Sequence, residues 1–281
     1  MKKGMSLCLS IIVAGMFSST VLAQDFEYHP ALSDNFSIVL GAFKSDNAFK
    51  VSAEGIIEDE IEETIDFDDS VGVDESSTLL NAQLRWKFGK KRKWSLWGQY
   101  FNNTANGEAV LTQDVEWQDV TFREGTFVGA GVDLAVTRLF IGRSFVKNQQ
   151  HDFGIGVGLH NLDLSVFIEG DTEIDDESTE FFRGDAESSQ PLPNVGVWYN
   201  VSPARKWLIH ARVDWISANI GDYDGTLWNA NVGINYQAFR HVGFDLSYQF
   251  FELNLKVDKT DWRGEIDMTY DGPVLAVMFN W

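Results

Sequence analysis

The sequence is short of cysteine, proline and long apolar runs, and each shortage excludes a class of protein. Cys8 is the only cysteine among the 281 residues. It lies inside an N-terminal segment with the features of a secretory signal, so we expect a mature chain without disulfides, thiolate nucleophiles or cysteine metal ligands. Beyond that segment, no apolar run approaches the roughly 18 residues of a transmembrane helix. A membrane protein with this composition would have to cross with strands closed into a barrel.

The N-terminal segment has the three parts of a signal peptide. Lys2 and Lys3 form a positive region, and residues 7–17 form an apolar region too short to span a bilayer. The tripeptide Val21–Ala23 ends in the small residue that a signal peptidase needs. We therefore expect residues 1–23 to be a signal peptide and residues 24–281 to be one domain. An uncleaved membrane anchor is the alternative.

Basic residues are also scarce. The chain has 22 Lys and Arg against 42 Asp and Glu, a formal net charge of −20. Loss of Lys2 and Lys3 brings the mature chain to about −22, and no nucleic-acid partner is expected because such binding needs clustered Lys and Arg. The 10 Trp, 7 Tyr and 21 Phe, with only 5 Pro, favour strands over a disordered chain.

Alternation of apolar and other residues predicts β-strands along the mature chain. The clearest segments carry aromatic residues at the ends of the apolar face, as a lipid-facing band does: 78–89, 207–215, 228–236 and 242–250. Further strands are predicted at 36–56, 94–106, 126–146, 151–169 and, as a short one, 193–201. After His160 the apolar face changes parity to Leu162 and Leu164, which predicts either a β-bulge or the exit of the strand from the bilayer.

The last predicted strand, residues 270–281, ends on an aromatic residue. Counting back in twos from Trp281 gives an unbroken apolar face through Phe279 to Pro273. This pattern resembles the closing strand of bacterial outer-membrane β-barrels. The resemblance implies that Phe279 and Trp281 belong to the signal read by the barrel assembly machinery, and that the protein lies in the outer membrane with its lipids and lipopolysaccharide. Segments 65–72 and 222–224 loosely resemble those of uncharacterised, porin-like outer-membrane barrels of proteobacteria.

The connections between predicted strands alternate in length and charge. Short basic connections lie at 90–93, 147–151, 202–206 and 237–241, and mostly longer acidic ones lie at 58–77, 107–125, 170–190, 219–224 and 258–264. Outer-membrane barrels have short periplasmic turns and longer outer loops. The pattern predicts an all-β, transmembrane, antiparallel up-and-down barrel of ten strands with both termini in the periplasm. Twelve strands remain the alternative, if 36–57 is a hairpin followed by a strand at 62–69.

Several charged residues lie on the strand faces opposite the apolar ones and are candidates for the lumen: Arg85, Lys87, His210, Arg212, Asp214 and Asp245, with His160 further round. Their mixed signs predict mutual neutralisation in a narrow polar lumen. The residue types of a hydrolase are present in His160, Ser165, His210 and Asp214. However, His210 and Asp214 are about 13 Å apart along one strand, and no catalytic motif joins them. We assign no catalytic residue.

We therefore expect a non-enzymatic barrel without a cofactor, either a narrow porin-like channel or a structural or surface-interaction protein. An outer-membrane hydrolase acting on lipid or peptide at the barrel rim is the alternative. In Asp171–Glu177 the carboxylates are spaced as in calcium loops, but the glycine of an EF-hand is missing and Phe182 stands at its twelfth position. Solvated charge is the favoured interpretation, and divalent cations that bridge the acidic loops to lipopolysaccharide remain the alternative.

Overall fold

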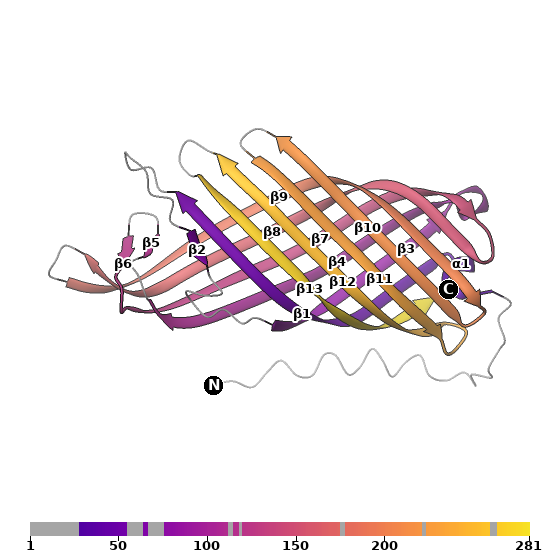
Figure 1. Ribbon diagram of the computed structural model, residues 1–281. Helices are drawn as coiled ribbons and strands as arrows, with labels where there is room; N and C mark the ends of the chain where they lie inside the picture. Colours follow the sequence, from indigo (N-terminus) through magenta and orange to yellow (C-terminus); the bar gives the residue numbers. More distant parts are fainter. Residues whose placement is uncertain are drawn as a thin grey trace.

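Ten long strands form one closed antiparallel barrel (Figure 1). The computed structural model describes residues 28–54, 64–66, 76–111, 115–117, 120–174, 178–220, 223–258 and 263–281. The barrel strands are β1 (Phe36–Glu54), β3 (Ser76–Phe88), β4 (Trp94–Val110), β7 (Phe127–Lys147), β8 (His151–Ile174), β9 (Ser178–Ala204), β10 (Trp207–Ile220), β11 (Tyr223–Gln237), β12 (Val242–Asp258) and β13 (Arg263–Asn280). Each pairs with its neighbours in sequence, and β13 pairs with β1 to close the barrel. The prediction of ten strands is confirmed.

The two ends of the barrel differ. The turn end carries the short turns, the 3-10 helix η1 (Lys90–Arg92), the helix α1 (Pro30–Ser33) and the C-terminus (Figure 1). The loop end carries three short strands, β2 (Thr64–Asp66), β5 (Val115–Trp117) and β6 (Val120–Phe122). Within the described residues, no helix combines the length and apolar character needed to cross a membrane.

Two features of the predicted strands are wrong. The alternative with twelve strands fails because β2 pairs only with Lys50–Ser52 of β1 and adds no strand to the wall. The strand predicted as short at 193–201 is the longest, β9, with 27 residues. Pro191 and Pro193 lie inside it, facing outward, and they broke the alternating pattern. Parts of the predicted loops 107–125 and 170–190 accordingly belong to long strands.

The parity change after His160 is not a β-bulge. The pairing of β8 with β7 and with β9 continues through this position without a register shift. His160, Leu162 and Ile168 are all buried, so the same face of the strand points inward throughout. What changes is the chemistry of the two faces: the inward face becomes apolar. This outcome favours the other prediction, that β8 leaves the bilayer here.

The barrel wall divides into two sheets toward the loop end. The pairing of β9 with β10 stops at Val195 and Trp215, although both strands continue. On the opposite side, the pairing of β3 with β4 stops at Asn81 and Phe101. Beyond these points β4, β7, β8 and β9 form one sheet, and the other six strands form a second sheet that faces it.

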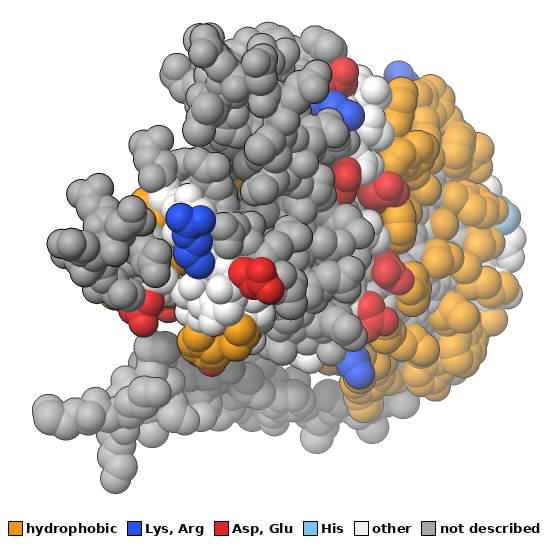
Figure 2. All heavy atoms as spheres, turned by 60° about the vertical axis from the view of Figure 1, so that its left-hand side comes forward, with side chains coloured by type: hydrophobic (Ala, Val, Ile, Leu, Met, Phe, Trp, Pro, Cys, Tyr) orange, Lys and Arg blue, Asp and Glu red, His pale blue; other side chains and the backbone are white. Residues whose placement is uncertain are grey.

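The outer surface nearer the turn end is a broad apolar belt, bordered by acidic side chains (Figure 2). Large apolar side chains such as Leu80, Leu246 and Leu275 are 60–66% exposed there. On β10 and β11, aromatic pairs mark both edges of the belt, Trp207 with Tyr236 and Trp215 with Trp228. A belt of nine residues along β10 matches the 9–11 residues with which a tilted strand crosses a bilayer.

The interior of the barrel is apolar at the loop end and polar inside the apolar belt, the reverse of the outer surface. Between the two sheets of the loop end lies an apolar core, in which Phe43, Phe101 and Phe251 are at most 1% exposed. The ring of Phe101 meets those of Phe43 and Phe251 edge to face, with centroids 6.5 and 5.7 Å apart. Because these rings come from both sheets, the core joins them across the lumen. Inside the apolar belt the interior is instead polar.

Candidate functional site: a polar lumen chamber

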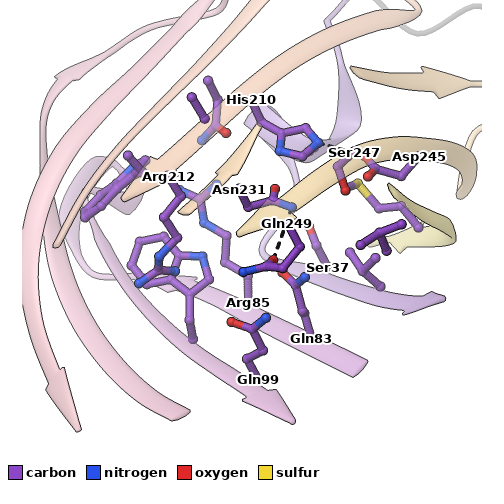
Figure 3. Close-up of a pocket in the computed structure, with 18 of the residues that line it drawn as sticks. Ser37, Gln83, Arg85, Gln99, His210, Arg212, Asn231, Asp245, Ser247 and Gln249 are labelled. Carbon is purple, nitrogen blue, oxygen red and sulfur yellow. Dashed lines mark hydrogen bonds and ion pairs between the residues drawn. The ribbon is translucent and has the colours of Figure 1, made fainter. Parts of the chain in front are cut away.

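A polar chamber lies in the lumen between the apolar core and α1, since Val274 of the core and Ala31 of α1 both line it. Figure 3 shows the polar side chains around it. Its volume is about 110 Å³. Alternation along the strands places its side chains inward, because their neighbours in sequence face the apolar belt. The lining includes Ser37, Gln83, Arg85, Gln99, His210, Arg212, Asn231, Asp245, Ser247 and Gln249.

Two buried aspartates each hold two cations. Asp152 pairs through Oδ2 with Arg85 Nη2 at 2.7 Å and with Lys147 Nζ at 2.8 Å. The hydroxyl of Ser144 donates to its other oxygen at 2.6 Å. Asp214 pairs through Oδ1 with Arg138 Nη2 at 2.8 Å and through Oδ2 with Arg212 Nε at 2.9 Å. These contacts join β3, β7, β8 and β10 across the lumen.

An aromatic cluster lies between the two groups of ion pairs. The indole of Trp97 has the guanidinium carbons of Arg85 and Arg212 at 4.7 and 5.0 Å from its centroid. Trp198 packs against Trp97 with centroids 4.5 Å apart. Its ring occupies space that a side chain at Gly154 would need. The inward glycine face of β8 therefore makes room for the aromatic cluster.

Two histidines make polar contacts in the lumen, one with a carboxylate and one with an amide. His210 Nε2 lies 2.9 Å from Asp245 Oδ2, across the space between β10 and β12. His160 Nε2 lies 3.2 Å from Asn229 Nδ2 and is fully buried. His210 does not contact Asp214, whose oxygens are bonded to the two arginines.

The segment with α1 lies across the turn end of the chamber. Ala31 and Leu32 are buried against Leu208 and Met278. Lys87 Nζ donates to the carbonyl oxygens of Ala31 and Asp34. Ala31 also lines the chamber. The helix thereby forms the floor of the chamber.

Two further groups fix this segment at the turn end. Both oxygens of Asp34 accept from Arg240 in the turn between β11 and β12, at 2.7 and 3.0 Å. This hydrogen-bonded pair raises the pKa of the Arg240 guanidinium. The backbone N–H of Ala31 donates to Nδ1 of the buried His29, and burial lowers the pKa of His29 to about 4.

The six charged residues predicted for the lumen are placed there: Arg85, Lys87, His210, Arg212, Asp214 and Asp245. Five of them line or border the chamber, and Lys87 holds α1. Ser165 does not join His160, His210 or Asp214, since it lies at an outward position of β8 beyond the chamber. The described residues therefore do not bring the four hydrolase candidates together.

The predicted assembly residues lie at the turn end of the wall. Phe279 is half-buried and Trp281 is 51% exposed. The backbone of Trp281 pairs with Phe36, and their rings lie 6.5 Å apart in a stacked arrangement. Within the described chain, no three His, Asp or Glu side chains are grouped so as to hold a metal ion. Residues 175–177 of the calcium-like segment lie outside that range.

Sequence reasoning missed Arg138, Lys147 and Asp152. Asp152 could have been found, because it shares its parity with Gly154 and Gly156 on the glycine face of β8. Arg138 likewise shares its parity with buried Val136 and Phe140. Lys147 could not, because a shift of register between Ser144 and Val146 reverses its parity.

Solved structures of similar fold include outer-membrane proteins. The outer membrane protease OmpT from Escherichia coli is 8% identical with a TM-score of 0.56, over 91% of this chain and 99% of that one. The Pseudomonas putida toluene transporter TodX (9% identity, TM-score 0.37, 90% and 92% covered) and OprG from Pseudomonas aeruginosa (10%, 0.35, 92% and 99%) are less similar. No protein-family model and no curated protein matches the sequence. The chain has the fold of an outer-membrane β-barrel, and its apolar belt is the surface that such a barrel places in lipid.

Proposed function

We propose that this protein is a non-enzymatic outer-membrane barrel with a closed lumen, whose role is to present its loop end at the cell surface. The observation that carries the proposal is the apolar core between the two sheets of the loop end. Phe43, Phe101 and Phe251 meet across the lumen at the level where a channel would need an open path. The alternative, a narrow porin-like channel, would require the rings of this core to move apart and open a path through the lumen.

The long strands support a role in surface interaction. β7, β8 and β9 continue well beyond the apolar belt toward the loop end (Figure 1). Exposed acidic side chains, such as Asp133 and Asp163, replace the apolar ones on their outer faces. Lipopolysaccharide, with divalent cations between its phosphates and these carboxylates, is a partner of matching chemistry. The barrel assembly machinery is the partner that the C-terminal strand would meet earlier, during insertion.

A hydrolase is the second candidate function, since one protein of similar fold is a protease. At 8% identity that likeness concerns the fold alone. In the part of the chain that the structure describes, the closest pairing of a histidine with a carboxylate is His210 with Asp245. It lies in the chamber inside the lumen, and not at the barrel rim, where a hydrolase of lipid or peptide would meet its substrate.

Conductance in planar lipid bilayers tests the closed lumen. We expect the wild-type protein to show no stepwise conductance, because the apolar core and α1 close the lumen in series. Deletion of residues 28–34 should leave it silent, since the core remains. The triple substitution of Phe43, Phe101 and Phe251 by Ser should also stay silent alone.

Combining the deletion with the triple substitution should produce discrete channels. A matched control carries the deletion with Phe101→Leu, which keeps the core apolar and should not conduct. Discrete channels from the wild-type protein would contradict the proposal directly.

A further inference from the structure

The polar half of the lumen holds more cations than anions. Around the chamber, the cations exceed the carboxylates by four to three: Arg85, Arg138, Lys147 and Arg212 against Asp152, Asp214 and Asp245. Lys87 adds a fifth cation at the floor, where its described hydrogen bonds go to carbonyl oxygens. The carboxylate of the floor, Asp34, is paired with Arg240 and leaves the excess unchanged. A charge held away from water is costly unless an opposite charge compensates it.

The excess positive charge is concentrated around the indole of Trp97, which Arg85 on β3 and Arg212 on β10 approach from opposite sides of the barrel. Arg85 and Arg212 lie against the same indole, and each shares its carboxylate with a second cation. Their described hydrogen bonds use Nη2 of Arg85, and Nε and Nη2 of Arg212. A guanidinium has five N–H donors, so both arginines retain donors beyond these bonds.

Amide groups complete the surroundings. Gln83 and Gln99 are direct partners in the pairing of β3 with β4, two pairs beyond Arg85 and Trp97 and on the same inward face. Both line the chamber with Arg85 and Arg212 (Figure 3). Amide N–H groups and guanidinium groups are donors that suit an anion, and charge-assisted hydrogen bonds are the stronger kind.

We propose that the chamber binds one small monovalent anion between Arg85, Arg212 and the amides of Gln83 and Gln99. A volume of about 110 Å³ admits a halide, nitrate or formate ion. For comparison, a cavity of about 150 Å³ holds benzene. The anion offsets the excess positive charge and so stabilises the barrel from within. This proposal does not depend on the function of the loop end.

Bromide is the probe for a stability test. The purified barrel, refolded in detergent, is equilibrated overnight in sodium bromide or in sodium gluconate at equal ionic strength. Gluconate is an anion too large for the chamber. We expect the thermal midpoint to be about 3–5 °C higher in bromide once bromide is tenfold above its dissociation constant. Equilibrium dialysis should find one bromide per protein after subtraction of a detergent blank.

A tethered carboxylate provides the matching variant. Gln99→Glu places a negative charge in the chamber without a change of shape, so it should raise the midpoint in gluconate and abolish the difference between the two salts. Gln149→Glu makes the same change of charge in an exposed turn, and it should keep the full difference. Gln83→Glu is the second variant if Gln99→Glu fails to fold.

Two results would overturn the proposal. One is a wild-type protein with equal thermal midpoints in the two salts and no bromide bound in dialysis. This result would mean that the excess positive charge of the chamber is compensated without a bound anion. The other is a folded Gln99→Glu or Gln83→Glu variant that retains the full bromide effect.

Discussion

Single residues organise the lumen by sharing charge. Asp152 on β8 reaches Arg85 on β3 and Lys147 on β7, and Asp214 on β10 reaches Arg138 on β7. A buried carboxylate with two cationic partners links strands that are not neighbours in the wall. Removing one such carboxylate leaves two cations without a partner, which is far more costly than losing an exposed ion pair.

We predict that Asp152→Asn will lower the free energy of unfolding by about 3–5 kcal/mol, because Arg85 and Lys147 then remain charged in a poorly hydrated lumen. Urea titration of the detergent-refolded protein measures the effect. Asp245→Asn is the matched control, since its described ion-pair partner is a histidine and not two permanent cations. Equal losses in the free energy of unfolding for the two variants would show that a carboxylate shared by two cations contributes no more to stability than one paired with a histidine.

Individual strands exchange the chemistry of their two faces along their length. In β8, Ile155 and Val157 are exposed near the turn end, while Leu162 and Ile168 are buried nearer the loop end. The reversal occurs without any change in pairing. The solvent therefore decides which face is apolar: lipid covers the outside of the first part, and water covers the outside of the second.

This reversal explains how far the sequence could be read. Strands with apolar outward faces, such as β10 and β11, are predictable from alternation alone. The outer half of β9 is not, because its exposed face is polar and Pro191 and Pro193 break the pattern. A strand accepts these prolines here because the pairing of β9 with β10 has already ended at Val195.

The sequence predicts which side chains face the chamber wherever the alternation of inward and outward residues along a strand is regular. Arg85 and Arg212 were placed inward by their apolar neighbours in sequence. Their partners could not be chosen, because the contact of Arg85 with Asp152 depends on the curvature of the closed barrel. The helix α1 has only four residues, too few for a periodic signal, so the sequence does not predict the floor of the chamber.

The element that closes the turn end should respond to acid. Nδ1 of His29 accepts a hydrogen bond from Ala31, and protonation at that nitrogen removes the acceptor. The pKa of His29 is lowered to about 4 by burial, from 6.5. A released segment takes up a proton below pH 6.5 while the docked segment does not, so docking is strongest above pH 6.5 and weakens as the pH falls toward 4.

We therefore predict that a cysteine at Leu32 will react with a methanethiosulfonate reagent faster at low pH, by up to about tenfold per pH unit between 6.5 and 4. The rate is divided by that of a cysteine at the exposed Gln149, which corrects for the chemistry of the thiol. His29→Gln, which does not titrate in this range, should flatten the profile. A profile that keeps its slope in this variant would assign the effect to another group.

As a whole, the molecule combines two kinds of folded structure. Across the apolar belt it is a membrane barrel, apolar outside and polar inside. At the loop end it resembles a soluble β-sandwich, in which two facing sheets bury an apolar core. The wall opens between β9 and β10 and between β3 and β4 at the level of this change, because two facing sheets pack closer together than opposite walls of a round barrel.

Such a chain has to insert its polar interior and apolar exterior together, and the C-terminal strand is where closure occurs. β13 pairs with both β12 and β1. The ring of Trp281 stacks on that of Phe36 at the seam. We propose a second role for Phe279 and Trp281, which the resemblance of the C-terminal strand implies: they form part of the signal by which the assembly machinery recognises the unfolded chain.

The two roles separate in experiment. Trp281→Ala should cost only about 0.5–1.5 kcal/mol of stability, since it removes one stacked pair at a partly exposed end. Phe36→Ala removes the same pair and also the stacking of Phe36 on Trp86, whose ring centroids are 6.0 Å apart, so it should cost at least as much in a urea titration. In cells, however, Trp281→Ala should reduce the amount of membrane-inserted protein several-fold more than Phe36→Ala does, because only the former alters the C-terminal signal. Equal insertion of the two variants would leave Trp281 with a structural role alone, and recognition would then have to rest on the apolar face that Val277 and Leu275 continue.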